Sequence, residues 1–90
     1  MATKRFEKMF ALKEATETFL ALNEAFNPGI INVNVYGDAI VSVGAQVTTK
    51  EDKLQFIKTA KTMVTNGVDI TCYYHRAIRR YCIDLKWSLE

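Results

Sequence analysis

Residues 68–87 alternate inward and outward side chains in two runs, 68–75 and 80–87, and this period of two predicts a pair of β-strands. We expect an antiparallel hairpin in which the numbers of paired residues sum to 155. One side of that hairpin then carries only apolar or aromatic pairs: Val68–Trp87, Ile70–Leu85, Cys72–Ile83 and Tyr74–Tyr81. A shift of one residue would place Ile70 beside a charged side chain, so the pattern also fixes the register. The bend at 76–79 contains no glycine, asparagine or proline, and a short helical turn is the alternative there.

Two amphipathic helices are predicted earlier in the chain. The first covers residues 4–26, with Thr3 as its N-cap and Asn27-Pro28-Gly29 as its end. Its apolar stripe comprises Met9, Leu12, Thr16, Phe19, Leu20, Leu22 and Phe26. The second follows Thr49, the expected N-cap, and ends at Asn66-Gly67. Its stripe comprises Leu54, Ile57, Ala60, Lys61 and Val64, with Phe56 and Met63 alongside.

Residues 30–47 predict another hairpin, because two apolar runs flank Gly37-Asp38, which suits a two-residue type II′ turn. That turn pairs Val33 with Ser42 and leaves apolar groups on both faces of the hairpin. Either Gly44 marks a bulge that corrects the register, or a partner covers the second face. Our hypothesis is that another copy of the chain packs there. The expected dimer face comprises Tyr36, Ile40, Val41 and Val43.

The 90 residues are therefore expected to form one α+β domain, with halves at 4–47 and 49–87. A shift of 37 residues superposes similar patterns, for example Phe19 on Phe56, which indicates a two-fold αββ-αββ pseudo-repeat. The simplest assembly is a four-stranded antiparallel sheet with both helices on one face. Leu89-Glu90 receives no role, because two such residues can remain from cloning.

Composition limits the classes of function. No apolar run approaches the roughly 20 residues of a membrane-spanning helix. The basic start of the chain is not followed by the apolar stretch of a signal peptide, so we expect a cytoplasmic protein with reduced thiols. Residues 48–90 carry eight basic and five acidic side chains. The sequence pI of about 8.6 is below that of a dedicated nucleic-acid binder.

The predicted hairpin at 68–87 gathers both cysteines, the one histidine and three arginines. A structural zinc site needs about four ligands, and Cys72 and His75 point to opposite faces of a strand, so we expect no metal site and no cofactor. We expect both thiols to act as small buried hydrophobes, with Cys72 inward and Cys82 outward. An enzyme with Cys82 as nucleophile beside Tyr73 and Arg80 is a distant third reading, since nothing supplies an oxyanion site.

These observations predict a small non-enzymatic binding module that acts by protein–protein contact, such as an accessory or inhibitor protein, and that forms a homodimer. The expected partner-binding residues are Tyr73, His75, Arg76, Arg79 and Arg80. The alternative is nucleic-acid binding by the same basic tip. An arginine-bearing β-ribbon can enter a groove, and exposed aromatic rings can stack on bases.

Overall fold

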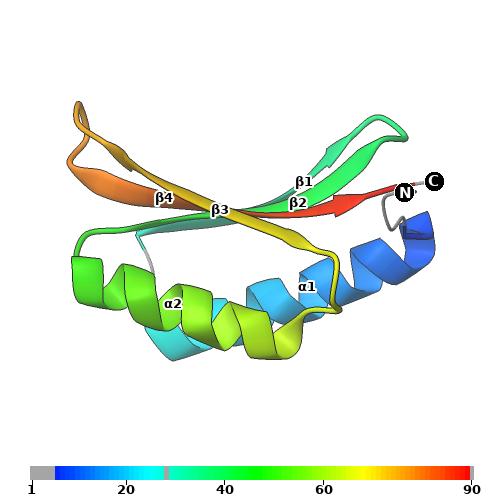
Figure 1. Cartoon of the computed structure of the whole chain (residues 1–90), viewed down its shortest axis with the longest axis horizontal. Coiled ribbons are helices and arrows are strands. Elements are labelled where there is room, and N and C mark those ends of the chain that lie inside the picture. Colours follow the sequence, from blue (N-terminus) through cyan, green and yellow to red (C-terminus); the bar gives the residue numbers. More distant parts are fainter. Residues whose placement is uncertain (1–5, 28, 90) are drawn as a thin grey trace.

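The computed structural model describes residues 6–27 and 29–89. The elements follow the order α1 (Lys8–Phe26), β1 (Ile30–Tyr36), β2 (Ile40–Val47), α2 (Lys50–Met63), β3 (Asp69–His75) and β4 (Arg80–Ser88). The strands form one antiparallel sheet in the order β1-β2-β4-β3, so β2 and β4 are central. Both helices cover the same face of the sheet (Figure 1). The predicted α+β fold is therefore confirmed, and a duplication of its two αββ halves stays a prediction.

The hairpin of β3 and β4 has the predicted register. Ile70 pairs with Leu85 and Cys72 with Ile83, and Asp69 lies opposite Lys86 on the other face. The last pair is His75 with Arg80, so residues 76–79 form the connecting turn. Because no glycine occupies this turn, the left-handed position falls to Arg79, whose φ is +54°.

The register predicted for the first hairpin was wrong by one residue. Tyr36 pairs with Ile40, so the loop has three residues and not two, and Gly37 takes the left-handed position with φ +58°. Val33 consequently faces Val43 instead of Ser42. The ladder runs without interruption past Gly44, which pairs with Asn32 and is not a bulge.

This shift also corrects the proposed dimer face. Val41 and Val43 are 0% and 1% exposed, because the register turns them toward the helices, and they belong to the core. Tyr36 and Ile40 lie on the opposite side of the sheet, since side chains alternate along a strand. The misfit that suggested a covered second face therefore does not exist.

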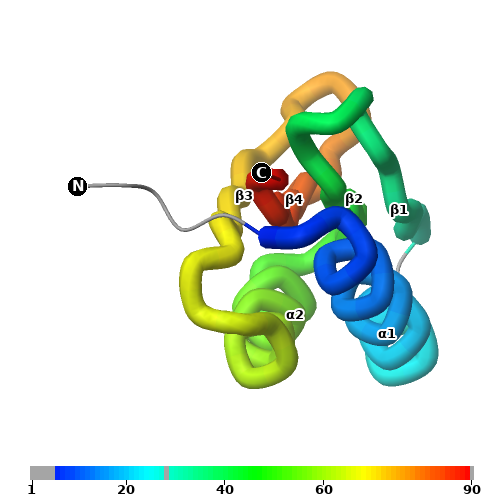
Figure 2. Tube along the Cα trace, turned by 90° about the vertical axis from the view of Figure 1, so that its right-hand side faces the viewer, coloured from blue at the N-terminus to red at the C-terminus, as the bar shows by residue number. Residues whose placement is uncertain are grey.

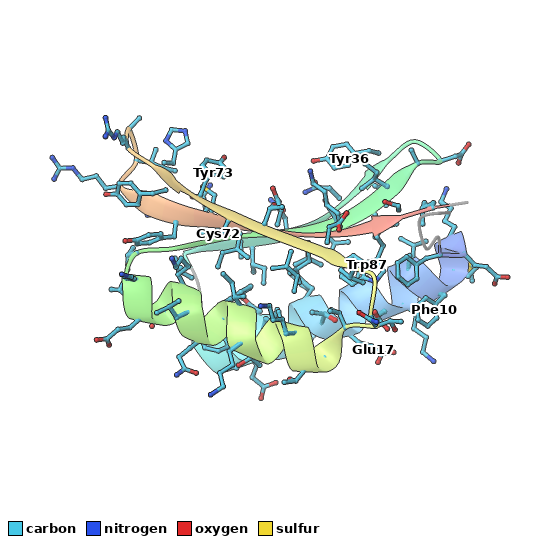
Figure 3. The ribbon with its side chains drawn as sticks, viewed as in Figure 1. Phe10, Glu17, Tyr36, Cys72, Tyr73 and Trp87 are labelled. Atoms are coloured by element: carbon cyan, nitrogen blue, oxygen red, sulfur yellow. The ribbon has the colours of Figure 1, made fainter. Side chains whose placement is uncertain are left out.

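The core lies between the sheet and the helices. Trp87 is fully buried opposite Val41, and Figure 3 shows its ring on the helix side of the sheet. The other large, fully buried side chains are Phe56, Leu22, Ile83, Leu85, Leu89, Val43 and Thr18. β2 and β4 supply three of these seven residues, as well as Trp87 and Val41, which agrees with their central position.

The stripe through which α1 packs on the sheet overlaps the predicted one only in part: Leu22 is fully buried, and Leu12, Phe19 and Phe26 pack against the core. Its buried residues are Ala11, Ala15, Thr18 and Leu22. Met9 and Leu20 were expected inside but are 79% and 58% exposed. Small alanine side chains let a helix approach a sheet closely, so the bulkier neighbours are turned outward.

α2 begins as predicted. The hydroxyl oxygen of Thr49 accepts a hydrogen bond from the N–H of Asp52 at 3.1 Å, which is an N-cap. Phe56 and Ala60 are buried, whereas Leu54 is 54% exposed and Lys61 is also exposed, contrary to the predicted stripe.

The two ends of the described chain meet. Phe6 and Leu89 form a parallel bridge, and the N–H of Phe6 donates to the carbonyl of Ser88 at 2.9 Å. Leu89 is 1% exposed, so the expectation that it has no role was wrong: it fills the end of the core. α1 begins at Lys8 and not at residue 4, and the predicted N-cap Thr3 and Glu90 lie outside the described residues.

Glu14 connects three elements beneath the sheet. Its carboxylate accepts hydrogen bonds from the N–H and the hydroxyl of Thr65, at 2.8 and 2.7 Å, and from Nε1 of Trp87 at 3.1 Å. α1, the segment after α2, and β4 are thereby held in one arrangement. This network lies on the helix side of the sheet, and neither helix covers the opposite face.

Candidate binding surface on the open face of the sheet

No described helix covers the second face of the sheet, which we call the open face. Three rows of side chains cross its four strands: Asn34–Ser42–Lys86–Asp69, Asn32–Gly44–Asp84–Thr71 and Ile30–Gln46–Cys82–Tyr73. Both hairpin turns curve away from the helices, so the open face is concave from one end to the other (Figure 1). Tyr36 and Tyr73 stand on this side near the two ends (Figure 3).

A hollow of about 170 Å³ lies at the centre of the open face. Its lining includes Asn32, Asn34, Gln46, Tyr73, Cys82 and Asp84. Gly44 forms the floor, since a β-carbon there would lie 3.0 Å from Oδ1 of Asn32 and 3.3 Å from Oδ1 of Asp84. The amide of Asn34 donates to Oδ1 of Asn32 at 2.9 Å, which fixes the direction of that oxygen. The hollow therefore presents the side-chain oxygens of Asn32 and Asp84 as hydrogen-bond acceptors around Gly44, which has no side chain.

The basic tip, residues 75–80, forms one end of the open face. The rings of Tyr73 and His75 lie 6.3 Å apart, and His75 pairs across the hairpin with Arg80. Arg76 and Arg79 are exposed in the turn. The structure therefore brings together the five residues predicted to bind a partner.

The side chains of Arg80 and His75 are less accessible to a partner than we expected from the sequence. The guanidinium of Arg80 extends to the backbone of Gly29, where a β-carbon would come within 2.5 Å of Nη1. Nδ1 of His75 is buried and has no hydrogen-bond partner among residues 6–27 and 29–89. Arg76 and Arg79 are consequently the side chains of the tip that a partner reaches first.

The two free thiols lie on opposite faces of the sheet, as predicted. Burial raises the pKa of Cys72, against an opposing effect of Lys53. A hydrogen bond with the side chain of Cys82 raises the pKa of Tyr73, which keeps the phenol protonated beside the hollow. Within the described part of the chain, no group of three or more histidine, cysteine or carboxylate side chains could hold a metal ion.

The polar centre of the open face was missed from the sequence. With the expected two-residue turn, Asn32 and Asn34 would lie on the face opposite Gln46, because that turn reverses the face of every residue on one strand relative to the other. The observed register places all three on one face. The valines of the two strands indicate the correct register, because a three-residue loop, unlike a two-residue turn, places the valines of both β1 and β2 on one face.

The class that this fold and surface define is a small α+β protein with one open, concave sheet face. The chain matches no protein-family model, no curated protein and no solved structure. No helix in the described residues is long and apolar enough to cross a membrane.

Proposed function

We propose that this chain is a small non-enzymatic binding module that recognises another protein with the open face of its sheet and the basic tip. The observation that supports this proposal is the open face itself. All core-forming side chains of the sheet point to the helices, yet the other side carries ordered amides and exposed tyrosines. Tyrosine and arginine are the residues most enriched at the energetic centres of protein interfaces.

The chemistry of the tip favours an acidic partner surface. Arg76 and Arg79 are exposed in the turn of the same hairpin as Tyr73, which is 56% exposed. Charge complementarity of this kind accelerates association and selects partners. We further propose that the protein acts in the cytoplasm, where both thiols would stay reduced.

The experiment is affinity capture from the native host with the tip charge reversed. The double variant Arg76→Glu with Arg79→Glu changes two exposed side chains that pack on nothing in the core. The matched control is Lys50→Glu with Lys58→Glu on α2, which alters the net charge equally on the helix side. We expect the tip variant to lose the captured protein and the control to retain it. Retention by both variants would place the site elsewhere, and equal loss would indicate attraction by net charge alone.

Nucleic-acid binding is a second candidate, supported by the adjacent rings of Tyr73 and His75 beside the arginines. Each phosphate contact contributes about 0.9 to the slope of log affinity against log salt concentration. Replacing Arg76 and Arg79 with alanine should then lower that slope by roughly 2. A captured partner that survives nuclease treatment and shows no such slope excludes this candidate.

A further inference from the structure

β1 is an outer strand of the sheet, and its seven residues, IINVNVY, include no charge, no proline and no glycine. None of the described residues pairs with its outer edge. Natural proteins usually protect such an edge with lysine, proline, a bulge or a covering segment. β1 shows none of these devices among residues 6–27 and 29–89, so the edge is competent to pair with another strand.

The register determines which backbone groups of β1 face outward. The N–H of Leu89 donates to the carbonyl of Ala39 at 2.7 Å, so the odd-numbered residues of β2 bond to β4. The even-numbered residues of β2 therefore bond to the even-numbered residues of β1. The N–H and C=O groups of Ile31, Val33 and Val35 remain, and they point away from the sheet.

We propose that a second copy of this chain pairs with β1, antiparallel and about a two-fold axis through Val33, to form one continuous sheet across a homodimer. In this register Val33 faces the partner's Val33, and Ile31 faces the partner's Val35. All six of these residues present outward N–H and C=O groups, so every exposed backbone group on the edge gains a bond. The strand is thus self-complementary in its backbone.

The side chains are self-complementary in the same register. On the helix side, Ile31, Val33 and Val35 meet only one another, and Val35 is 45% exposed in the single chain. On the open face, Asn32 meets the partner's Asn34, which extends the amide pair seen within the strand. No residue pair across the joined strands brings two charges together, because β1 contains no charged residue.

The flank of α1 beside β1 continues this apolar edge. Leu12 and Phe19 point away from Glu14 around the helix, since each residue turns the chain by about 100°. Both are packed only partly into the core. α1 lies under the β1 side of the sheet (Figure 2), so the α1 flanks of two copies would pack together below the joined strands.

The opposite edge, β3, lacks this complementarity. α2 accompanies that edge and carries lysines there: Lys53 lies 5.2 Å from the centre of the Tyr81 ring, and Lys61 lines a hollow with Val68 and Ile70. Two copies joined through β3 would bring these like charges together.

The dimer proposed at β1 leaves the basic tip and the open face accessible, so it is independent of the proposed function.

Hydrogen exchange of the unmodified protein, measured residue by residue at several concentrations, tests the proposal. We expect the amides of Ile31, Val33 and Val35 to become protected as the dimer forms. The outward amides of β3, at Ile70, Cys72 and Tyr74, are the internal control and should exchange equally at all concentrations. Light scattering should report twice the mass of one chain at the higher concentrations. A monomer at about 100 μM, or protection at β3, would overturn the proposal.

A pair of matched variants gives an independent readout. Val35→Lys places two charges into the joined strands, and Ile78→Lys places the same charge at an equally exposed site in the basic tip, since the two side chains are 45% and 44% exposed. We expect Val35→Lys to raise the dimer dissociation constant at least about tenfold, and Ile78→Lys to leave it unchanged. Circular dichroism verifies that both variants fold. A folded Val35→Lys variant that dimerises normally would also overturn the proposal.

Discussion

The indole Nε1–H of Trp87 donates a hydrogen bond to Oε1 of Glu14 at 3.1 Å, across 73 positions of the chain. Thr65 donates two further bonds to the same carboxylate. Hydrogen bonds to a charged group contribute more than neutral ones, and a buried donor left without a partner costs roughly 1–3 kcal/mol. This carboxylate therefore holds α1, the segment after α2 and β4 in one arrangement.

Glu14→Ala is expected to lower the free energy of unfolding by about 3 kcal/mol, because three donors lose their acceptor. Urea denaturation followed by the fluorescence of Trp87 measures this directly. Glu17→Ala, an exposed carboxylate on the same helix, is the control and should change stability by less than about 0.5 kcal/mol. Equal effects of the two variants would show that the network contributes nothing.

Leu89→Ala should cost about 3 kcal/mol of unfolding free energy, since Leu89 is 1% exposed and its removal leaves a cavity at the end of the core. Leu54→Ala deletes the same atoms from a side chain that is 54% exposed, and should cost less than about 0.5 kcal/mol. Thermal or urea unfolding of both variants makes the comparison. A mild effect at Leu89 would restore the original expectation that this residue has no role.

Arg79→Gly should be neutral or should stabilise the protein by up to about 1 kcal/mol. The φ of +54° costs a residue with a β-carbon about 1 kcal/mol, and glycine removes that cost while adding freedom to the unfolded chain. Arg76→Gly, in the same turn without a positive φ, should destabilise instead. The midpoint of urea unfolding is measured for both variants, and we expect that of Arg79→Gly to be higher than that of Arg76→Gly. A lower midpoint for Arg79→Gly would show that the turn has another geometry.

Cys72 should react with iodoacetamide more slowly than free cysteine at neutral pH, because burial raises its pKa and lowers the thiolate fraction. The difference in alkylation rate between the unmodified protein and the Cys72→Ser variant gives the rate at Cys72, because Cys82 is the other free thiol. The folded state retains the thiol proton more tightly than the unfolded state, because burial raises the pKa of Cys72. This contribution to stability is therefore complete below the unfolded pKa and is lost as the pH rises through the folded pKa. Alkylation of Cys72 as fast as a free thiol would contradict the buried placement.

The second hairpin could be predicted from sequence because both of its strands alternate without a fault, so a single register satisfies every pair. The first hairpin could not be predicted by its turn alone. Gly37-Asp38 fits a two-residue turn, yet Ala39 also belongs to the loop, and this extra residue reverses the faces of one strand. Hydrophobic pairing, and not the local turn signal, decided the register.

The contact face of α1 was obscured for a different reason. A stripe chosen by size selects Met9 and Leu20, whereas the helix is held against the sheet by Ala11 and Ala15, which are 0% exposed. Small residues give a weak hydrophobic signal even where they permit the closest packing. The basic tip needed no such correction, since its residues are adjacent in sequence and a hairpin turn brings them together in any register.

The position of β4 between β2 and β3 has a consequence for synthesis of the chain. β2 bonds to β4 along its inner edge, and Trp87, the partner of Val41, is translated 46 residues later. At 5–20 residues per second this interval is roughly 2–9 s. During that time β2, whose side chains are largely buried in the finished fold, has an unpaired edge. A ribosome stalled before residue 80 would therefore hold a half-sheet that chaperones must shield from aggregation.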